Sequence, residues 1–375
     1  MSDFPDRCRA FAAAAAMPPS REAFDALGAA TAPLWRAVDG STRDALEVGA
    51  GVLREVVASP DVHVAAAAGA AIAIGALVER GLSPRPYAAT IAARCREALE
   101  AAAPFLIEAQ AAGDALDETG LEGLDEDALE YVAGRDLPRD VVERIARSMP
   151  LAADAYFALD RLCLPTIACL TRDPEARALA RADVAFAEAA AVHRYDFGKW
   201  IHQLLVADAD AEWIVLDHAS RRGFVVRVEE LSENWAIQPL LADVLVRGAG
   251  WGGGAEGPED GLSGERPSRA LVECLQGRGP QSLQERVRGH WEVYTFGAIG
   301  PGGVLREGPL EHKVWNEGIP DDIPKVDGHR VIVLGTELVQ RSWNACRAYG
   351  ALGSRMEWVR ELTREEVEAW YARGQ

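Results

Sequence analysis

The apolar positions of the first 206 residues recur at helical spacing. One such set shares a single broad helical face: Leu46, Val48, Leu53, Val56 and Val57. Ser20 and Ser41 precede two of these apolar runs, as helix-capping residues do. Helix lengths vary and no fixed repeat length emerges. The pattern therefore predicts an irregular all-α helical domain.

Glycine and proline mark the predicted helix ends. One helix is expected from Pro60 to Arg80, followed by Gly81, a favoured residue just beyond a helix. The next is expected to end before Pro104, and Pro165 to kink or break its own helix, because proline lacks the amide hydrogen. A long helix is expected from Asp173 to about residue 205.

The pattern changes to short β-branched runs after residue 206. Residues 212–217 and 223–228 flank a turn-rich connector and predict a β-hairpin. Short helical pieces are expected up to Arg288, then a strand-rich stretch over 291–343 and a strand at 356–360. Thr363 and Glu366 have the spacing of a capping box that begins the last helix. These features predict a smaller mixed α+β domain with a mainly antiparallel sheet.

Length and composition place a boundary between the two patterns. A chain of 375 residues exceeds the ~250–300 residues at which single hydrophobic cores stop growing. Nine of the ten tryptophans lie at or after Trp200, whereas alanine becomes less frequent there. We therefore expect a helical domain over 1–206 and an α+β domain over 207–375. A glycine-rich flexible loop is predicted at about 248–267.

The net charge is −19, and the sequence pI is about 4.9. An acidic surface repels nucleic acid and anionic lipid and suits a basic peptide or protein, although solubility alone also explains such a charge. Nine acidic residues and no basic one lie between Glu108 and Glu130. That stretch is either an acidic docking face or a solvated loop.

Compartment and membrane association follow from other features. The six cysteines have no paired spacing, which favours a reducing compartment. The N-terminus lacks the pattern of a signal peptide. The most apolar window, 62–78, is shorter than the ~20 residues needed to span a bilayer. We expect a cytoplasmic protein without membrane contact.

Candidate chemistry was sought among metal ligands, nucleophiles and cofactor loops. His290, His312 and His329 could hold a metal if the fold brought them together, but no ligand spacing such as HxH or HExxH occurs. The glycines of 297–303 suit a hairpin turn better than a dinucleotide loop. No metal or cofactor is assigned, and a metal-dependent enzyme that uses these histidines stays an alternative.

No nucleophile shows the surroundings of a catalytic one. Cys274 and Cys346 lack an adjacent histidine, and Ser342 lacks the flanking glycines of a nucleophile elbow. The sequence therefore predicts no catalytic residue.

Residue types that dominate binding surfaces gather in the strand-rich stretch. The expected peptide-binding residues are Trp315, Asn316, Arg330, Arg341, Trp343 and Asn344. A single tryptophan is more often part of a core than of an interface, so the set carries more weight than any member. An exposed strand edge in the same domain could also add an extended peptide as a further strand.

Two segments resemble a bacterial family of uncharacterised function. They are residues 315–335 with Arg341-Ser-Trp-Asn344, and residues 234–245. In overall make-up the chain is also similar to accessory peptide-binding proteins of crocagin-type pathways for ribosomally made, modified peptides (RiPPs). The resemblance implies a non-catalytic protein that holds a precursor peptide for a modifying enzyme. An acidic immunity or antitoxin protein is a further alternative.

Overall fold

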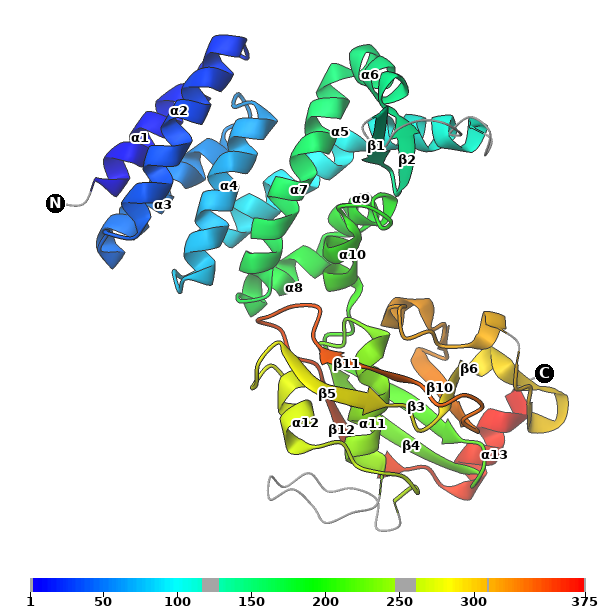
Figure 1. Ribbon diagram of the computed structural model, residues 1–375. Coiled ribbons are helices and arrows are strands. Elements are labelled where there is room, and N and C mark those ends of the chain that lie inside the picture. The colour runs from blue at the N-terminus through cyan, green and yellow to red at the C-terminus, as the bar shows by residue number, and fades with distance from the viewer. Residues whose placement is uncertain (1–2, 117–127, 247–260, 309, 374–375) are drawn as a thin grey trace. The chain divides into compact units, whose positions relative to one another are not determined.

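The computed structural model describes residues 3–116, 128–246, 261–308 and 310–373. The chain forms two compact units, Met1–Leu205 and Val206–Gln375 (Figure 1). The predicted fold class is confirmed, since a helical part is followed by an α+β part with a mainly antiparallel sheet. Most of the acidic stretch at 108–130 and of the predicted loop at 248–267 lies outside the described residues.

The first unit is built from helices and one short hairpin. The helices are α1 (Phe4–Ala15), α2 (Arg21–Val38), α3 (Arg43–Ala58), α4 (Val64–Glu79), α5 (Ala88–Ala115), α6 (Arg139–Ser148), α7 (Pro150–Leu170), α8 (Pro174–Ala182), α9 (Val184–Val192) and α10 (Lys199–Val206). The antiparallel hairpin consists of β1 (Leu129–Val132) and β2 (Arg135–Pro138).

Several helix ends follow the sequence signals. The Ser20 hydroxyl caps α2 by accepting a hydrogen bond from the Ala23 amide. Gly81 adopts φ +100° beyond α4, as helix-ending glycines do. α3 is capped by Thr42 instead of Ser41, and α4 begins at Val64 rather than Pro60.

Neither Pro104 nor Pro165 ends its helix. α5 continues through Pro104, so the helix end expected before it is wrong, and α7 continues through Pro165 without the break that was one of the two alternatives there. Both helices bury much of their length, so tertiary packing outweighs the amide hydrogen bond that each proline removes. At Pro165 the neighbouring α4 carries Gly75, where an added Cβ would lie 2.7 Å from the Pro165 Cβ.

The single long helix expected from Asp173 to residue 205 is also wrong. The Asp173 carboxylate caps α8 as expected, by accepting from the amides of Glu175 and Ala176. Asp183 then leaves the helical conformation and caps α9 by accepting from the Phe186 amide. A second capping aspartate thus divides the segment.

The second unit contains a main sheet with strand order β12-β4-β3-β10-β6, to which β9 pairs at β10. Its strands are β3 (Ala211–Asp217), β4 (Arg222–Glu229), β6 (Glu292–Thr295), β9 (Lys325–Val326), β10 (His329–Gly335) and β12 (Arg355–Glu361). The predicted hairpin is the antiparallel pair β3–β4, and β10 runs parallel to β3.

Alternate residues of the sheet supply two separate cores. Trp213, Val215 and Leu334 face a core shared with α11 (Ile237–Leu245) and α12 (Arg269–Leu275). Ile214 and Leu216 face the other core, which includes residues of α13 (Arg364–Arg373). The predicted capping box begins α13, because Thr363 and Glu366 each bond the other's backbone amide.

A separate two-stranded sheet packs near α12. It pairs β5 (Ser282–Arg288) with β11 (Ser342–Cys346) in antiparallel fashion, and we call it the ribbon. The expectation of helical pieces up to Arg288 is therefore right for α12 and wrong for β5. A second small hairpin, β7 (Ile299–Gly300) with β8 (Val304–Leu305), contains the turn expected at 297–303.

Candidate functional site

The ribbon has a buried face and an exposed face. Val287 of β5 and Trp343 and Ala345 of β11 are buried in the core shared with α11 and α12. Because successive strand residues point to opposite faces, the residues between them point outward. This outer face carries exposed polar side chains: Gln284, Arg286, Arg288, Ser342, Asn344 and Cys346.

Two arginines of the outer face have no carboxylate partner among the described residues. The Arg286 guanidinium donates to the Ser342 carbonyl over 2.8 Å, and this neutral acceptor does not offset its charge. Arg288 makes no ion pair within the described ranges. Their cross-strand neighbours on β11 are the neutral Asn344 and Ser342.

A cavity of about 410 Å³ lies along β5. It is lined by four consecutive residues of this strand, Glu285–Arg288, although neighbouring side chains of a strand point to opposite faces. The cavity therefore follows the edge of the strand, where the backbone groups lie. This is the edge away from β11, and no other strand pairs with it in the described parts of the chain. We call the cavity the β5 groove.

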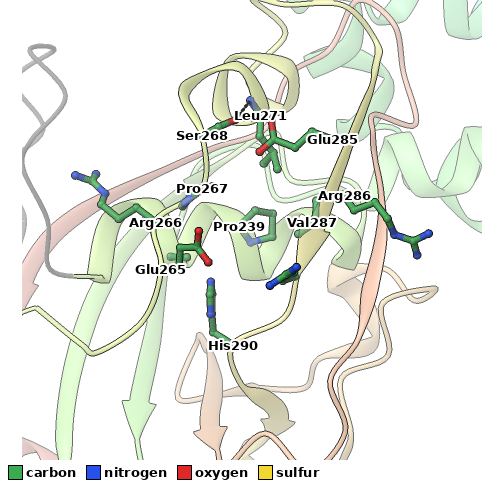
Figure 2. Close-up of a pocket in the computed structure, with 12 residues that line it drawn as sticks. Pro239, Glu265, Arg266, Pro267, Ser268, Leu271, Glu285, Arg286, Val287 and His290 are labelled. Atoms are coloured by element: carbon green, nitrogen blue, oxygen red, sulfur yellow. Dashed lines mark hydrogen bonds between the residues drawn. The ribbon is translucent and has the colours of Figure 1, made fainter.

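The floor and walls of the β5 groove come from neighbouring elements. Pro239, Ala242 and Leu271 supply apolar surface from α11 and α12. Figure 2 shows the Glu265 carboxylate and the His290 ring pointing toward one another inside it.

The rim of the β5 groove is polar. The Ser268 hydroxyl donates to the Glu285 carboxylate over 2.6 Å, so this acid already has a partner. Arg286 points away from the groove, onto the outer face of the ribbon (Figure 2). An open strand edge beside a mostly polar cavity with a smaller apolar part can hold an extended chain.

Two cations lie over the ring of Trp315, and one of them, Arg341, directly precedes β11. The buried Glu292 carboxylate lies 2.5 Å from Lys313 Nζ and 3.7 Å from Arg341 Nη2. Lys313 and Arg341 both lie over the Trp315 ring, at 5.3 and 5.7 Å from its centroid. The Trp315 side chain is 44% exposed, so its ring is open to a partner. Arg341 joins this group to the ribbon, because its carbonyl accepts from the Gly289 amide.

The structure separates the six predicted binding residues. Trp315, Arg341 and Asn344 reach the surface. Trp343 lies on the buried face of the ribbon, where its ring is 5.6 Å from that of Trp235.

Arg330 and Asn316 are also buried. The Arg330 guanidinium bonds Asp208 at 2.7 Å and the Ile323 carbonyl at 2.6 Å, and Asp208 in turn accepts from the Trp213 indole. This network ties β10 to the chain before β3. Arg330, Asn316 and Trp343 are therefore interior residues and do not form part of an exposed binding surface.

The histidines of the metal alternative lie at separate places. His290 lines the β5 groove, His312 packs beside Gly297, and a ring nitrogen of His329 lies 3.3 Å from the Glu212 carbonyl. Within the described ranges, no three His, Cys, Asp or Glu side chains gather into a group that could hold a metal. The structure thus does not bring the three together.

The two outer edges of the main sheet are less suited to strand addition. A register shift between Trp358 and Arg360 interrupts the pairing along β12, and such irregularities are typical of strand edges. At β6, Tyr294 forms an isolated antiparallel β-bridge with Lys313, and the Val314 amide donates to the Val293 carbonyl. The segment 313–314 therefore covers this edge of the sheet. The β5 edge, in contrast, runs beside a cavity over four consecutive residues.

Comparison of the chain with known protein families, with curated proteins and with solved structures finds no match. None of the helices in the described ranges combines the length and apolar character needed to cross a membrane.

Proposed function

We propose that the second unit binds an extended peptide, which adds as a third strand to the ribbon along the free edge of β5. The main-chain groups of β5 would supply affinity, and the groove floor would receive alternate side chains of the peptide. Trp315 and Arg341 would form a second contact beside the ribbon, since exposed tryptophan and arginine supply large contact area with polar groups.

One observation carries this proposal: among the described strands, the edge of β5 away from β11 has no pairing partner, and four consecutive residues of β5 line a cavity there. The lining of this cavity is mostly polar, with a smaller apolar part that includes Pro239, Ala242 and Leu271. The burial of Trp343 and Arg330 narrows the surface expected from the sequence but leaves Trp315, Arg341 and Asn344 beside the ribbon. Arg286, Arg288 and the β5 edge complete the proposed site.

We further propose an accessory role, in which the chain presents a precursor peptide to a modifying enzyme. The support is the likeness in make-up to peptide-binding proteins of modified-peptide pathways, together with the state of the two cysteines nearest the ribbon. Burial raises the pKa of Cys274, and partial desolvation together with the nearby Glu233 raises that of the exposed Cys346, which disfavours the reactive thiolate of each. All six cysteines are free thiols, which fits a reducing compartment such as the cytoplasm.

A peptide library displayed on phage and selected on the full-length protein would test the proposal. Selected peptides would be synthesised with a single backbone N-methyl group at each position in turn. In strand addition, alternate amides of the peptide point toward β5. N-methylation at every second position should therefore weaken binding about tenfold, through one lost hydrogen bond and a steric clash, while the positions between stay nearly unchanged.

A Trp315→Ala variant serves as a second probe of the same peptides. We expect weaker binding with only a small loss of stability, because Trp315 is 44% exposed and its ring contacts Lys313 and Arg341 near the surface. N-methyl scans without a two-residue period would refute strand addition.

A further inference from the structure

We infer that the bound peptide is acidic, with carboxylate side chains at alternate positions that pair with Arg286 and Arg288. This inference rests on the proposed function, and it concerns the chemistry of the partner. It also reverses the expectation drawn from the net charge of −19, which by itself suits a basic partner.

The geometry of strand addition places the charges. Arg286 and Arg288 are two residues apart on one strand and share its outer face. In a strand added beside β5, the residues directly opposite them would lie on the same face, with Cβ atoms about 4.5–5.5 Å away. Two peptide side chains at positions i and i+2 would therefore come within reach of the two guanidinium groups, and that of Arg286 would turn from the Ser342 carbonyl of β11 toward the added strand.

The ribbon itself does not neutralise these arginines. On the other side of β5, their cross-strand neighbours are Asn344 and Ser342, neither of which carries charge. The nearest acid along the strand, Glu285, points to the opposite face, toward Ser268. Like charges placed directly opposite would repel, so lysine or arginine at these peptide positions is disfavoured.

Further cations extend the same surface. The Arg341 carbonyl accepts a hydrogen bond from the amide of Gly289, the residue after Arg288. The Arg341 guanidinium lies 3.7 Å from the Glu292 carboxylate, and Lys313 Nζ lies closer to the same carboxylate. Glu265 opposes this charge from the groove wall, but it belongs to the groove and not to the outer face (Figure 2). Carboxylates on the outer face of the added strand would therefore meet mainly positive charge.

Three labelled heptapeptides would test the inference by fluorescence anisotropy with the full chain. They carry glutamate, glutamine or lysine at three alternate positions, with threonine and valine between. The glutamate peptide should bind about fivefold more tightly than the glutamine peptide, as two partly exposed ion pairs would give. The lysine peptide should bind most weakly, and added salt should weaken only the glutamate peptide.

A double variant, Arg286→Gln with Arg288→Gln, should lose the preference for glutamate and bind the glutamine peptide as the parent does. The matched control is Arg306→Gln with Arg364→Gln, which removes two exposed arginines outside the ribbon. It should keep the full preference. Far-UV circular dichroism would show that each variant is folded.

Equal affinity for the glutamate and glutamine peptides, or tighter binding of the lysine peptide, would overturn the inference and leave strand addition standing. An equal loss of preference in both double variants would overturn it as well, since net charge would then explain the effect. Binding of none of the three peptides contradicts the inference and strand addition together, because main-chain hydrogen bonds are common to all three.

Discussion

Trp315 and Trp343 show how position in an element decides what a side chain does. Both belong to the aromatic set expected to bind a peptide. Strand alternation directs Trp343 into the core beside Val287, whereas Trp315 lies outside a regular strand with its ring open. From residue type alone, both tryptophans were expected at a binding surface. Their positions in the fold decide that Trp343 is a core residue and Trp315 a surface residue.

Arg330 could not have been assigned from the sequence. Its partner, Asp208, lies 122 positions earlier in the chain, and no local pattern joins the two. An arginine in a strand-rich stretch indicates either an interface or a buried ion pair, and long-range pairing decides which. Arg286 and Arg288 could not be predicted as surface residues of a strand for a local reason. Their strand, β5, is mostly polar and shows only a weak alternation of apolar residues, so the sequence did not predict a strand there.

Glu233 gives a prediction of pH-dependent stability. Burial raises the pKa of its carboxyl from 4.5 to about 7, despite the opposing Ala348 amide and Arg347. The folded state therefore holds this proton more tightly than the unfolded state. The stabilisation is complete below about pH 4.5 and is lost as the pH rises through about 7.

Urea unfolding at about pH 5 and pH 7 would measure this effect against a Glu233→Gln variant. Glutamine keeps the acceptor for the Ala348 amide and cannot ionise. Between the two pH values, the parent should lose about 2–3 kcal/mol of unfolding free energy relative to the variant. Parallel pH profiles for the two proteins would show that Glu233 does not titrate in this range.

At the scale of elements, helices with strong local signals were predicted well, and those decided by packing were not. Ser20 and Asp173 cap helices as their spacing indicates, since capping is a local interaction. Pro165 lies inside α7 because the helix is held by its buried face, and because Gly75 of α4 leaves room for the ring. Such contacts between distant segments are invisible in a single sequence.

The contact between α4 and α7 can be tested with Gly75→Ala. The added methyl group would lie 2.8 Å from the Pro165 Cα, a backbone atom that cannot move aside without shifting the helix. We expect a loss of about 1–3 kcal/mol of unfolding free energy, as for overpacked cores, measured by urea denaturation followed by far-UV circular dichroism.

Gly51→Ala in α3 is the matched control. An added Cβ there meets no atom within 4 Å, so the same substitution should stabilise the helix by up to about 1 kcal/mol. Destabilisation by both substitutions to the same extent would argue against a specific α4–α7 contact.

At the scale of the whole molecule, composition indicates architecture better than it indicates partners. The change from alanine-rich to tryptophan-rich sequence accompanies the change from helices to an α+β unit. The net charge of −19, in contrast, averages over the whole surface and hides a ribbon whose outer face carries two arginines that form no ion pair with any residue the structure describes. A local face, rather than the total charge, meets a partner.

Hydrogen exchange of the β5 backbone amides, measured on the full-length protein with and without a selected peptide, tests strand addition most directly. The free edge of β5 should leave alternate amides between Ser282 and Arg288 unprotected in the free protein. Bound peptide should slow their exchange by at least about tenfold and leave the amides of β12 unchanged. Unchanged exchange in β5 at saturating peptide, or new protection along β12 instead, would contradict the proposed site.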